Sequence, residues 1–155
     1  MAKYRRVTIE WSYPVEINSL IEKEVVNDIG VYFITAKRRG KQAPLYIGKT
    51  VDSFKHRLKA HRDDWLDTYP GEKFVRLGRI ISPKHLSDEE LITVIEDAEK
   101  TIIFFMSQTE GYSLPANYIS TQSAYFEKPL KITNTGFRGD LPQELYIAES
   151  ELTFI

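Results

Sequence analysis

Cysteine is absent from this chain of 155 residues, and the net charge is only −1. Without cysteine the protein can form no disulfide, thiolate zinc site or cysteine nucleophile, so a metal would need oxygen or imidazole ligands. No stretch approaches the ~20 consecutive apolar residues of a membrane span, and the start of the chain lacks the apolar segment of a secretory signal. We therefore expect an intracellular, cytoplasmic protein with no membrane partner. The oligomeric state stays open.

The composition is that of one folded domain. Hydrophobic residues make up 42% and aromatic residues 12% of the chain, which is enough for a sizeable core at this length. We expect a single domain over residues 1–155, because no repeat or low-complexity stretch divides it.

The small net charge hides a strong segregation of charge. Residues 37–62 contain nine basic side chains and one acidic one, a local balance of +8, whereas the rest of the chain carries 12 basic and 21 acidic residues, or −9. A basic run is commonly only a solvated surface. Segregation this sharp nevertheless favours a surface that binds a polyanion such as a nucleic acid. The residues we assign to it are Lys37, Arg38, Arg39, Lys41, Lys49, Lys55, Lys59 and Arg62.

The spacing of apolar residues predicts strands and helices in alternation. β-branched and aromatic residues favour strands over residues 5–11, 30–36, 45–47 and 74–82. Residues 30–36 are apolar on both faces, as in a central strand, whereas residues 5–11 are a candidate edge strand. Residues 37–44 would join the next two strands into an antiparallel hairpin with a basic tip.

Two later segments have helical periodicity. From Val51 to Trp65 apolar positions recur at spacings of three and four, with Asp52 as the expected N-cap. Ser87 and Glu90 form a capping box that opens a largely buried helix over residues 88–107.

Two tyrosines lie on the adjacent strands of the expected hairpin. If the hairpin is symmetric about Arg39, Tyr32 lies directly opposite Tyr46, and directly opposed residues have Cβ atoms ~4.5 to 5.5 Å apart. The two phenols would then share one face of the sheet. A chance pairing is the alternative, because tyrosine is common in strands and an eight-residue connection leaves the register open.

Arg57 and His61 are four residues apart on the first of these helices, so their side chains project along one flank. A histidine on an apolar stripe is more often a core residue with satisfied hydrogen bonds than a catalytic group. Arg57 stands beside the stripe, and a partly buried guanidinium requires an anionic or carbonyl partner.

Glu99 places a carboxylate within the apolar face of the second helix. Glu96, one turn earlier, has polar neighbours and should be solvated. Burying an ionised carboxylate costs several kcal/mol unless it is paired or binds a metal. An ion pair, for which Arg57 is a candidate, and a metal site are therefore the two interpretations. The apolar helical neighbours of Glu99 are Ile92, Ile95, Ile102, Ile103 and Met106.

These residues form an ordered set along the chain, and the set resembles the GIY-YIG nuclease superfamily. The likeness spans roughly residues 29–118, and each half-motif alone would be weak. Asn117, the last member, also fits an ordinary turn. The set comprises Gly30-Val31-Tyr32, Leu45-Tyr46-Ile47-Gly48-Lys49-Thr50, Arg57, His61, Glu99 and Asn117.

The resemblance implies an α+β fold with a small three-stranded antiparallel sheet flanked by helices. This chain would add an N-terminal strand and a C-terminal hairpin made from residues 130–132 and 145–147. The implied activity is that of an endonuclease that hydrolyses DNA phosphodiester bonds with one divalent cation, Mg²⁺ or Mn²⁺.

The same resemblance implies roles for the individual residues. Glu99 would hold the cation, largely through water, and Tyr32 would act on the attacking water or orient it. Arg57 and Tyr46 would stabilise charge on the phosphate. His61 would assist by hydrogen bonding or proton relay, and Asn117 completes the catalytic set.

Two other functions remain alternatives at this point. One is a catalytically degenerate domain of this fold that binds nucleic acid or serves as an assembly module. The other is a structural α/β domain in which the tyrosines and Glu99 have no chemical role.

Overall fold

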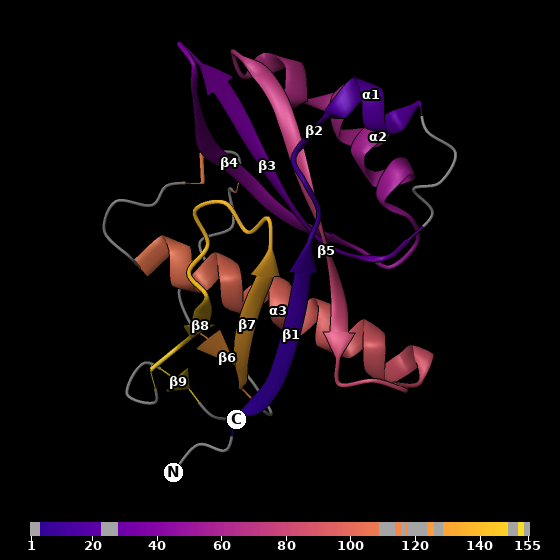
Figure 1. The fold of residues 1–155 in the computed structure, drawn as a ribbon, viewed down its shortest axis with the longest axis vertical. Helices are drawn as coiled ribbons and strands as arrows, with labels where there is room; N and C mark the ends of the chain where they lie inside the picture. Colours follow the sequence, from indigo (N-terminus) through magenta and orange to yellow (C-terminus); the bar gives the residue numbers. More distant parts are fainter. Residues whose placement is uncertain are drawn as a thin grey trace.

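The fold is built around one curved, mixed β-sheet (Figure 1). The computed structural model describes residues 4–22, 28–108, 114–115, 117, 124–125, 129–148 and 152–153. The strand order of the main sheet is β4-β3-β5-β1-β7-β8, with β2 pairing to β5, and β6 and β9 form a separate two-stranded pair. No described helix is long and apolar enough to cross a membrane.

The helices and strands of the described residues have the following bounds. The helices are α1 (Ile17–Ile21), α2 (Phe54–Asp64), the 3-10 helix η1 (Leu66–Thr68) and α3 (Asp88–Gln108). The strands are β1 (Arg5–Trp11), β2 (Val15–Glu16), β3 (Gly30–Arg38), β4 (Lys41–Thr50), β5 (Glu72–Ser82), β6 (Ala124–Tyr125), β7 (Leu130–Gly136), β8 (Glu144–Tyr146) and β9 (Leu152–Thr153).

The expectation of a small three-stranded antiparallel sheet is wrong. Strands β4, β3 and β5 do pair antiparallel in that order, but β5 also pairs with β1, and β1 pairs in parallel with β7. β1 is therefore an interior strand and not an edge strand. β7 and β8 pair antiparallel within this same sheet and do not stand apart as an added hairpin. The physical reason is that the alternation of residues indicates which face of a strand is buried. It does not indicate which other strands pair with that strand on either side.

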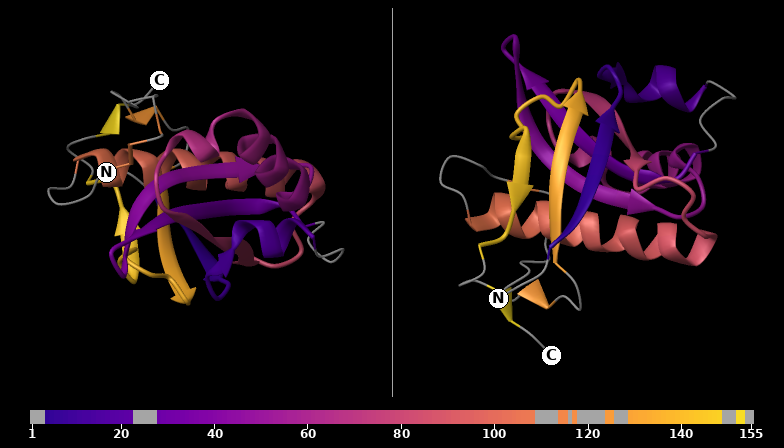
Figure 2. Two further views of the ribbon diagram at one scale, coloured as in Figure 1. Left: turned by 90° about the horizontal axis from the view of Figure 1, so that it is seen from above. Right: turned by 60° about the horizontal axis from the view of Figure 1, so that its bottom comes forward.

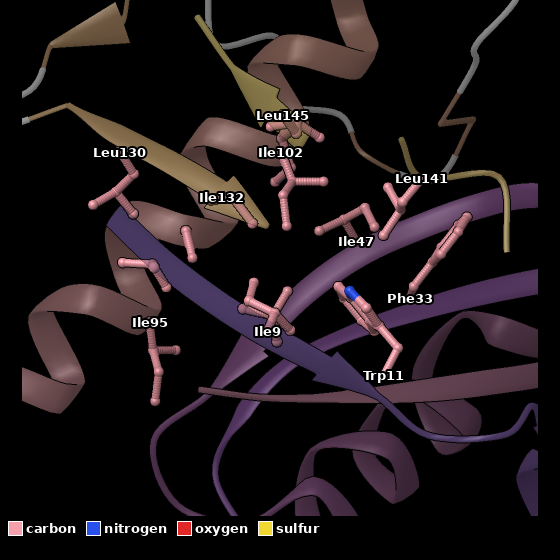
Figure 3. Close-up of a cluster of buried hydrophobic side chains, with 14 of the residues drawn as sticks. Ile9, Trp11, Phe33, Ile47, Ile95, Ile102, Leu130, Ile132, Leu141 and Leu145 are labelled. Atoms are coloured by element: carbon pink, nitrogen blue, oxygen red, sulfur yellow. The ribbon is translucent and has the colours of Figure 1, made fainter. Parts of the chain in front are cut away.

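Two hydrophobic clusters cover the two faces of the sheet. α3 packs against one face with side chains from β1, β3, β4, β7 and β8 (Figure 3). α1, α2 and η1 pack against the opposite face, over the β3, β4 and β5 end (Figures 1 and 2). β3 contributes Val31 and Phe33 to the first cluster and Tyr32 and Ile34 to the second. Its prediction as a central strand is confirmed.

The β3–β4 hairpin is longer and tighter than the sequence suggested. Its strands continue to Arg38 and resume at Lys41, which leaves a two-residue turn with positive φ angles of 53° at Arg39 and 79° at Gly40. A pair of positive φ values is typical of a type I′ turn, whose twist matches that of the strands. The expected eight-residue connection is therefore wrong.

The register of this hairpin differs from the symmetric one. A shift between Ile34 and Thr35 places Tyr46 opposite Ile34, and Tyr32 lies opposite Gly48. The expectation that Tyr32 and Tyr46 oppose each other directly is wrong. Because strand side chains repeat every two residues, the offset still leaves both tyrosines on the same face.

The two main helices begin at local capping signals. The capping box of α3 is confirmed, since the Ser87 backbone N–H donates to Glu90 Oε1 (3.1 Å) and the Glu90 N–H donates to Ser87 Oγ (3.2 Å). The N-cap of α2 is Ser53, whose Oγ accepts from the His56 N–H at 3.0 Å. Asp52, the expected cap, instead lies exposed with its carboxylate 3.1 Å from His56 Nδ1.

Gly30 opens β3 at a point where no side chain fits. A Cβ there would lie 2.2 Å from the carbonyl oxygen of Gly78 and 2.9 Å from the Phe54 ring. Strand β5 and helix α2 can approach the start of β3 because this residue is glycine.

We expect Gly30→Ala to lower the free energy of unfolding by about 3 kcal/mol, because the added methyl forces backbone and ring apart. Urea unfolding followed by circular dichroism measures the change. Gly40→Asn is the matched control: a Cβ at Gly40 meets no atom within 4 Å, and Asn tolerates positive φ. Equal destabilisation of the two variants would contradict the packing explanation.

Candidate active site

A cleft of about 900 Å³ lies at the β4 edge of the sheet. Residues of α3, from one face of the sheet, and of α2, from the other, line it. Five residues of the expected catalytic set line this cleft: one each from β4 and α3, two from α2, and Asn117. The described lining is Tyr46, Lys49, Arg57, Ala60, His61, Asp64, Trp65, Thr93, Glu96, Asp97, Glu99, Lys100, Ile103 and Asn117.

Tyr32 lies behind the cleft wall. Its side chain is fully buried, and its hydroxyl lies 2.6 Å from His61 Nε2. Its ring stacks on that of Tyr46 with centroids 6.0 Å apart. Gly48 leaves room for this phenol, since a Cβ there would lie 2.3 Å from the Tyr32 hydroxyl. Packing of the Tyr32 ring thus explains why the second half-motif has glycine at position 48.

The neighbours of His61 determine its tautomer. The Trp65 indole N–H donates to His61 Nδ1 at 2.9 Å. An indole is a donor only, so Nδ1 carries no proton. The neutral ring must then carry its proton on Nε2 and donate it to the Tyr32 oxygen. The Tyr32 hydroxyl hydrogen therefore remains available to another acceptor.

The protonation of His61 follows from the same environment. The imidazole is only 6% exposed. Burial, together with the nearby charge of Arg57, lowers its pKa from 6.5 to about 4. At neutral pH the ring is uncharged, so it acts as a hydrogen-bond donor to Tyr32 rather than as a cation.

Both tyrosines are held in the phenol form. Burial raises the pKa of Tyr32 well above its ordinary value, and proximity to Tyr46 adds to this, while a hydrogen bond with Arg57 acts in the opposite direction. Burial likewise raises the pKa of Tyr46, with a contribution from the charge of Glu99. Neither phenol loses its proton at neutral pH in the free protein, so a role as base requires added positive charge.

Arg57 is exposed as a whole residue, whereas its guanidinium is partly desolvated, as expected. Its side chain interacts with Tyr32 and Tyr46, two other members of the expected catalytic set. Desolvation lowers the pKa of Arg57, but hydrogen bonds and charge interactions with Tyr32 and Tyr46 raise it by more. The guanidinium therefore stands between the two phenols and open solvent, where it could also meet an anion.

Glu99 is half-buried on α3, and Glu96 is exposed, as expected of both. Glu96 forms an ion pair with Lys49 at 2.9 Å. Within the described chain, Glu99 makes no ion pair shorter than 4.0 Å. Burial raises the pKa of Glu99, although the charges of Lys49 and Arg57 lower it. The interpretation of Glu99 as a structural ion pair with Arg57 thus receives no support from the geometry.

If this site binds a divalent cation, one carboxylate with water ligands suits it better than a cage of several protein ligands. Among the described residues no group of three or more His, Asp and Glu side chains could hold a metal. Mg²⁺ is commonly bound through one or two carboxylates and keeps its other ligands as water or phosphate oxygens. A half-buried carboxylate without an ion pair suits that mode of binding.

Asn117 lines the cleft, and its side-chain amide is bonded to the backbone of β4. Its Oδ1 accepts from the Ile47 backbone N–H at 3.0 Å, and its Nδ2 donates to the Ile47 carbonyl at 2.9 Å. The amide thus pairs with the edge strand β4 as another strand would. Because Ile47 follows Tyr46, we interpret Asn117 as a positioning residue.

The basic residues predicted to bind nucleic acid lie on the β3–β4 hairpin and on α2. Lys37, Arg38, Arg39 and Lys41 are exposed around the tip of the β3–β4 hairpin. Lys55, Lys59 and Arg62 recur on α2 at helical spacing, and Arg62 donates to Asn18 Oδ1 of α1 at 3.2 Å. Of the eight, Lys49 alone lines the cleft. β4 carries the chain from the hairpin tip to the start of α2, and Arg62 near the end of α2 lines a hollow together with Gly71, which lies against Lys37 and Arg38.

Sequence reasoning missed Trp65 as a site residue, since it was counted only as part of the apolar stripe. Its ring lies 5.1 Å from Tyr46 and 5.0 Å from His61 between centroids. The spacing of four residues from His61 was the available signal.

Comparison with known proteins identifies no relative, because no protein-family model, curated protein or solved structure matches this chain.

We expect ¹⁵N NMR of the His61 imidazole at neutral pH to show a protonated Nε2 and an unprotonated Nδ1. Trp65→Phe removes the indole donor and should allow the Nδ1-protonated tautomer to appear. The same spectra of the exposed His56 provide an internal control. A dominant Nδ1-protonated form in the native protein would contradict the assignment.

Acid should weaken the fold through His61. The folded protein binds this proton only near pH 4, whereas the unfolded chain binds it below about 6.5. Between these values the unfolded state holds more protons, so stability falls as the pH is lowered. We expect the free energy of unfolding of the native protein to fall by up to about 3 kcal/mol more than that of His61→Gln across this window. The free energy of unfolding is measured with urea at each pH. If it falls by the same amount in both proteins, the lowered pKa of His61 is refuted.

Proposed function

We propose that this protein is an endonuclease that hydrolyses DNA phosphodiester bonds with one divalent cation, Mg²⁺ or Mn²⁺. One observation carries the proposal. Tyr46, Arg57, His61 and Glu99, which the resemblance singles out across more than fifty positions of sequence, line a single cleft. Tyr32 joins them through its hydrogen bond to His61.

Among the described residues Glu99 has no ion-pair partner, and its half-buried carboxylate argues against a purely structural role. A stable core gains nothing from a half-buried carboxylate that has no ion pair, since desolvation of the charge costs free energy. Enzymes concentrate such perturbed groups in clefts. The raised pKa values of Glu99 and both tyrosines fit this pattern.

Glu99 would hold the cation, which would supply positive charge at the phosphate and lower the barrier to attack by water. Arg57 would contact the same phosphate, because it is exposed in the cleft and already lies beside the two phenols. The Tyr46 hydroxyl would donate a hydrogen bond to a phosphate oxygen. This arrangement places the developing negative charge between a guanidinium and a phenol.

With positive charge added in the cleft, Tyr32 would release its phenolic proton to solvent, and the phenolate would then orient the attacking water and take its proton. His61 cannot receive that proton at Nε2, which already carries one. It would instead stabilise negative charge on the Tyr32 oxygen through the Nε2–H donor. Trp65, by fixing the tautomer, keeps this donor in place.

The alternative is a nucleic-acid-binding module of the same fold without cleavage activity. Its support is the position of the basic residues, since seven of the eight lie outside the cleft. Salt-dependent binding of DNA with no cleavage of any substrate would favour this alternative.

We expect Glu99→Gln to reduce Mg²⁺-dependent nicking of plasmid DNA roughly a thousandfold, since the cation contributes several kcal/mol and each 1.36 kcal/mol is a factor of ten. EDTA should abolish the nicking by the unaltered protein. Glu89→Gln, an exposed carboxylate in the first turn of the same helix, is the control and should retain activity. Nicking by Glu99→Gln at the native rate would exclude the proposed role of this residue.

A further inference from the structure

The cleft is larger than a cation and a phosphate require. Its volume is about 900 Å³. A cation that keeps about five waters occupies on the order of 150 Å³, at ~30 Å³ per water. A phosphate group adds the volume of a few waters. Most of the cleft therefore remains for another part of the substrate.

One part of the cleft wall is aromatic and aliphatic. Trp65, Tyr46, Ile103 and Ala60 all line the cleft. Trp65 is half-exposed, and its ring is held from behind by the edge of Tyr69 at 5.8 Å as well as by Tyr46. A rigid, partly exposed indole at the wall of a wet cleft is suited to stacking against a flat ring.

The charges of the cleft do not suit several phosphates at once. Its described lining contains four carboxylates and three cationic side chains, and Arg5 outside this lining pairs with Asp97 at 2.6 Å, so the cleft has no excess of positive charge. One phosphate can enter with a divalent cation, but the phosphates of adjacent nucleotides would meet carboxylates. A neutral ring therefore fits the remaining space better than more backbone does. The carboxylates are Asp64, Glu96, Asp97 and Glu99, and the cations are Lys49, Arg57 and Lys100.

We propose that the Trp65 wall is a nucleobase subsite, and that the preferred substrate strand carries an unpaired base next to the cleaved phosphate. This inference rests on the proposed nuclease function. A base within a duplex is stacked and cannot reach a cleft wall, whereas an unpaired or extruded base can. Stacking on an aromatic ring tolerates any base, so the subsite selects for strand structure and not for sequence.

Binding can be tested without cleavage, using 2′-deoxyadenosine 5′-monophosphate (dAMP) as the probe. Of the two tryptophans, Trp11 is 1% exposed in the core and Trp65 lines the cleft. With Mg²⁺ present, dAMP should quench the tryptophan fluorescence and protect it from acrylamide. The base-free compound 2-deoxyribose 5-phosphate should do neither. Equal effects of the two compounds would overturn the subsite.

Variants separate stacking from the second role of Trp65, its hydrogen bond to His61. Trp65→Phe keeps an aromatic face and loses the hydrogen bond, whereas Trp65→Ala loses both. By calorimetry we expect Trp65→Ala to weaken dAMP binding about tenfold or more and Trp65→Phe to weaken it only a few fold. Phe137→Ala, which removes an aromatic ring that is 55% exposed outside the cleft, is the matched control and should bind normally. Equal affinity of Trp65→Ala and the native protein would refute stacking.

A second variant tests the subsite independently, in case Trp65→Ala fails to fold. Ala60 is exposed on α2 and lines the cleft, so Ala60→Leu adds volume there without removing core packing. We expect unchanged thermal unfolding and weaker dAMP binding. Normal dAMP binding by this variant would place the nucleotide elsewhere and overturn the proposal.

Cleavage then tests the link to the substrate, with three DNA duplexes that differ at one position. One is fully paired, one carries an unpaired nucleotide, and one carries an abasic site there. We expect the unpaired substrate to be cut at least about tenfold faster than the other two. Equal rates would overturn the subsite and leave the nuclease proposal standing. Absence of all cleavage, with dAMP binding that still depends on the base and on Trp65, would instead refute the nuclease and support the subsite.

Discussion

The buried hydrogen bond between the Tyr32 hydroxyl and His61 Nε2 is the constraint on which the candidate site depends. Tyr32 lies on the central strand and is fully buried, so its hydroxyl must find a partner within the protein. His61 provides it at 2.6 Å, and the indole of Trp65 holds the other side of the imidazole. This chain of bonds ties α2 to β3 and fixes the direction of each donor.

The packing around this bond explains the glycines of the two half-motifs. Gly30 allows β5 and α2 to approach the start of β3, and Gly48 leaves the space that the Tyr32 phenol occupies. Asn117 pairs with the backbone of Ile47 and so holds the edge strand that carries Tyr46. Two glycines and the backbone contacts of Asn117 thus help to determine where the phenols lie.

The electrostatics of the cleft follow from the same arrangement. Burial keeps both tyrosines protonated and His61 neutral, and it raises the pKa of Glu99, while Arg57 adds positive charge from the exposed side. The free protein thus holds a partly desolvated carboxylate and two phenols beside one guanidinium. A cation and a phosphate would complete this balance of charges, which is the physical argument for hydrolysis of a phosphodiester.

Local patterns in the sequence determined much of the fold and the composition of the site. Alternation located β1, β3 and β5, the capping box located the start of α3, and helical neighbours distinguished half-buried Glu99 from exposed Glu96. These features depend on residues a few positions apart, which a sequence displays directly.

Only the tertiary structure decided the sheet order, the hairpin register and the position of the basic residues. The parallel pairing of β1 with β7 joins segments more than a hundred residues apart, and periodicity contains no information about such partners. A one-residue irregularity after Ile34 moved Tyr46 from its expected place, and the turn into β5 places Gly71, which lines a hollow with Arg62 of α2, against Lys37 and Arg38. The sequence by itself therefore determined which side chains are available, and long-range pairing decided which of them meet.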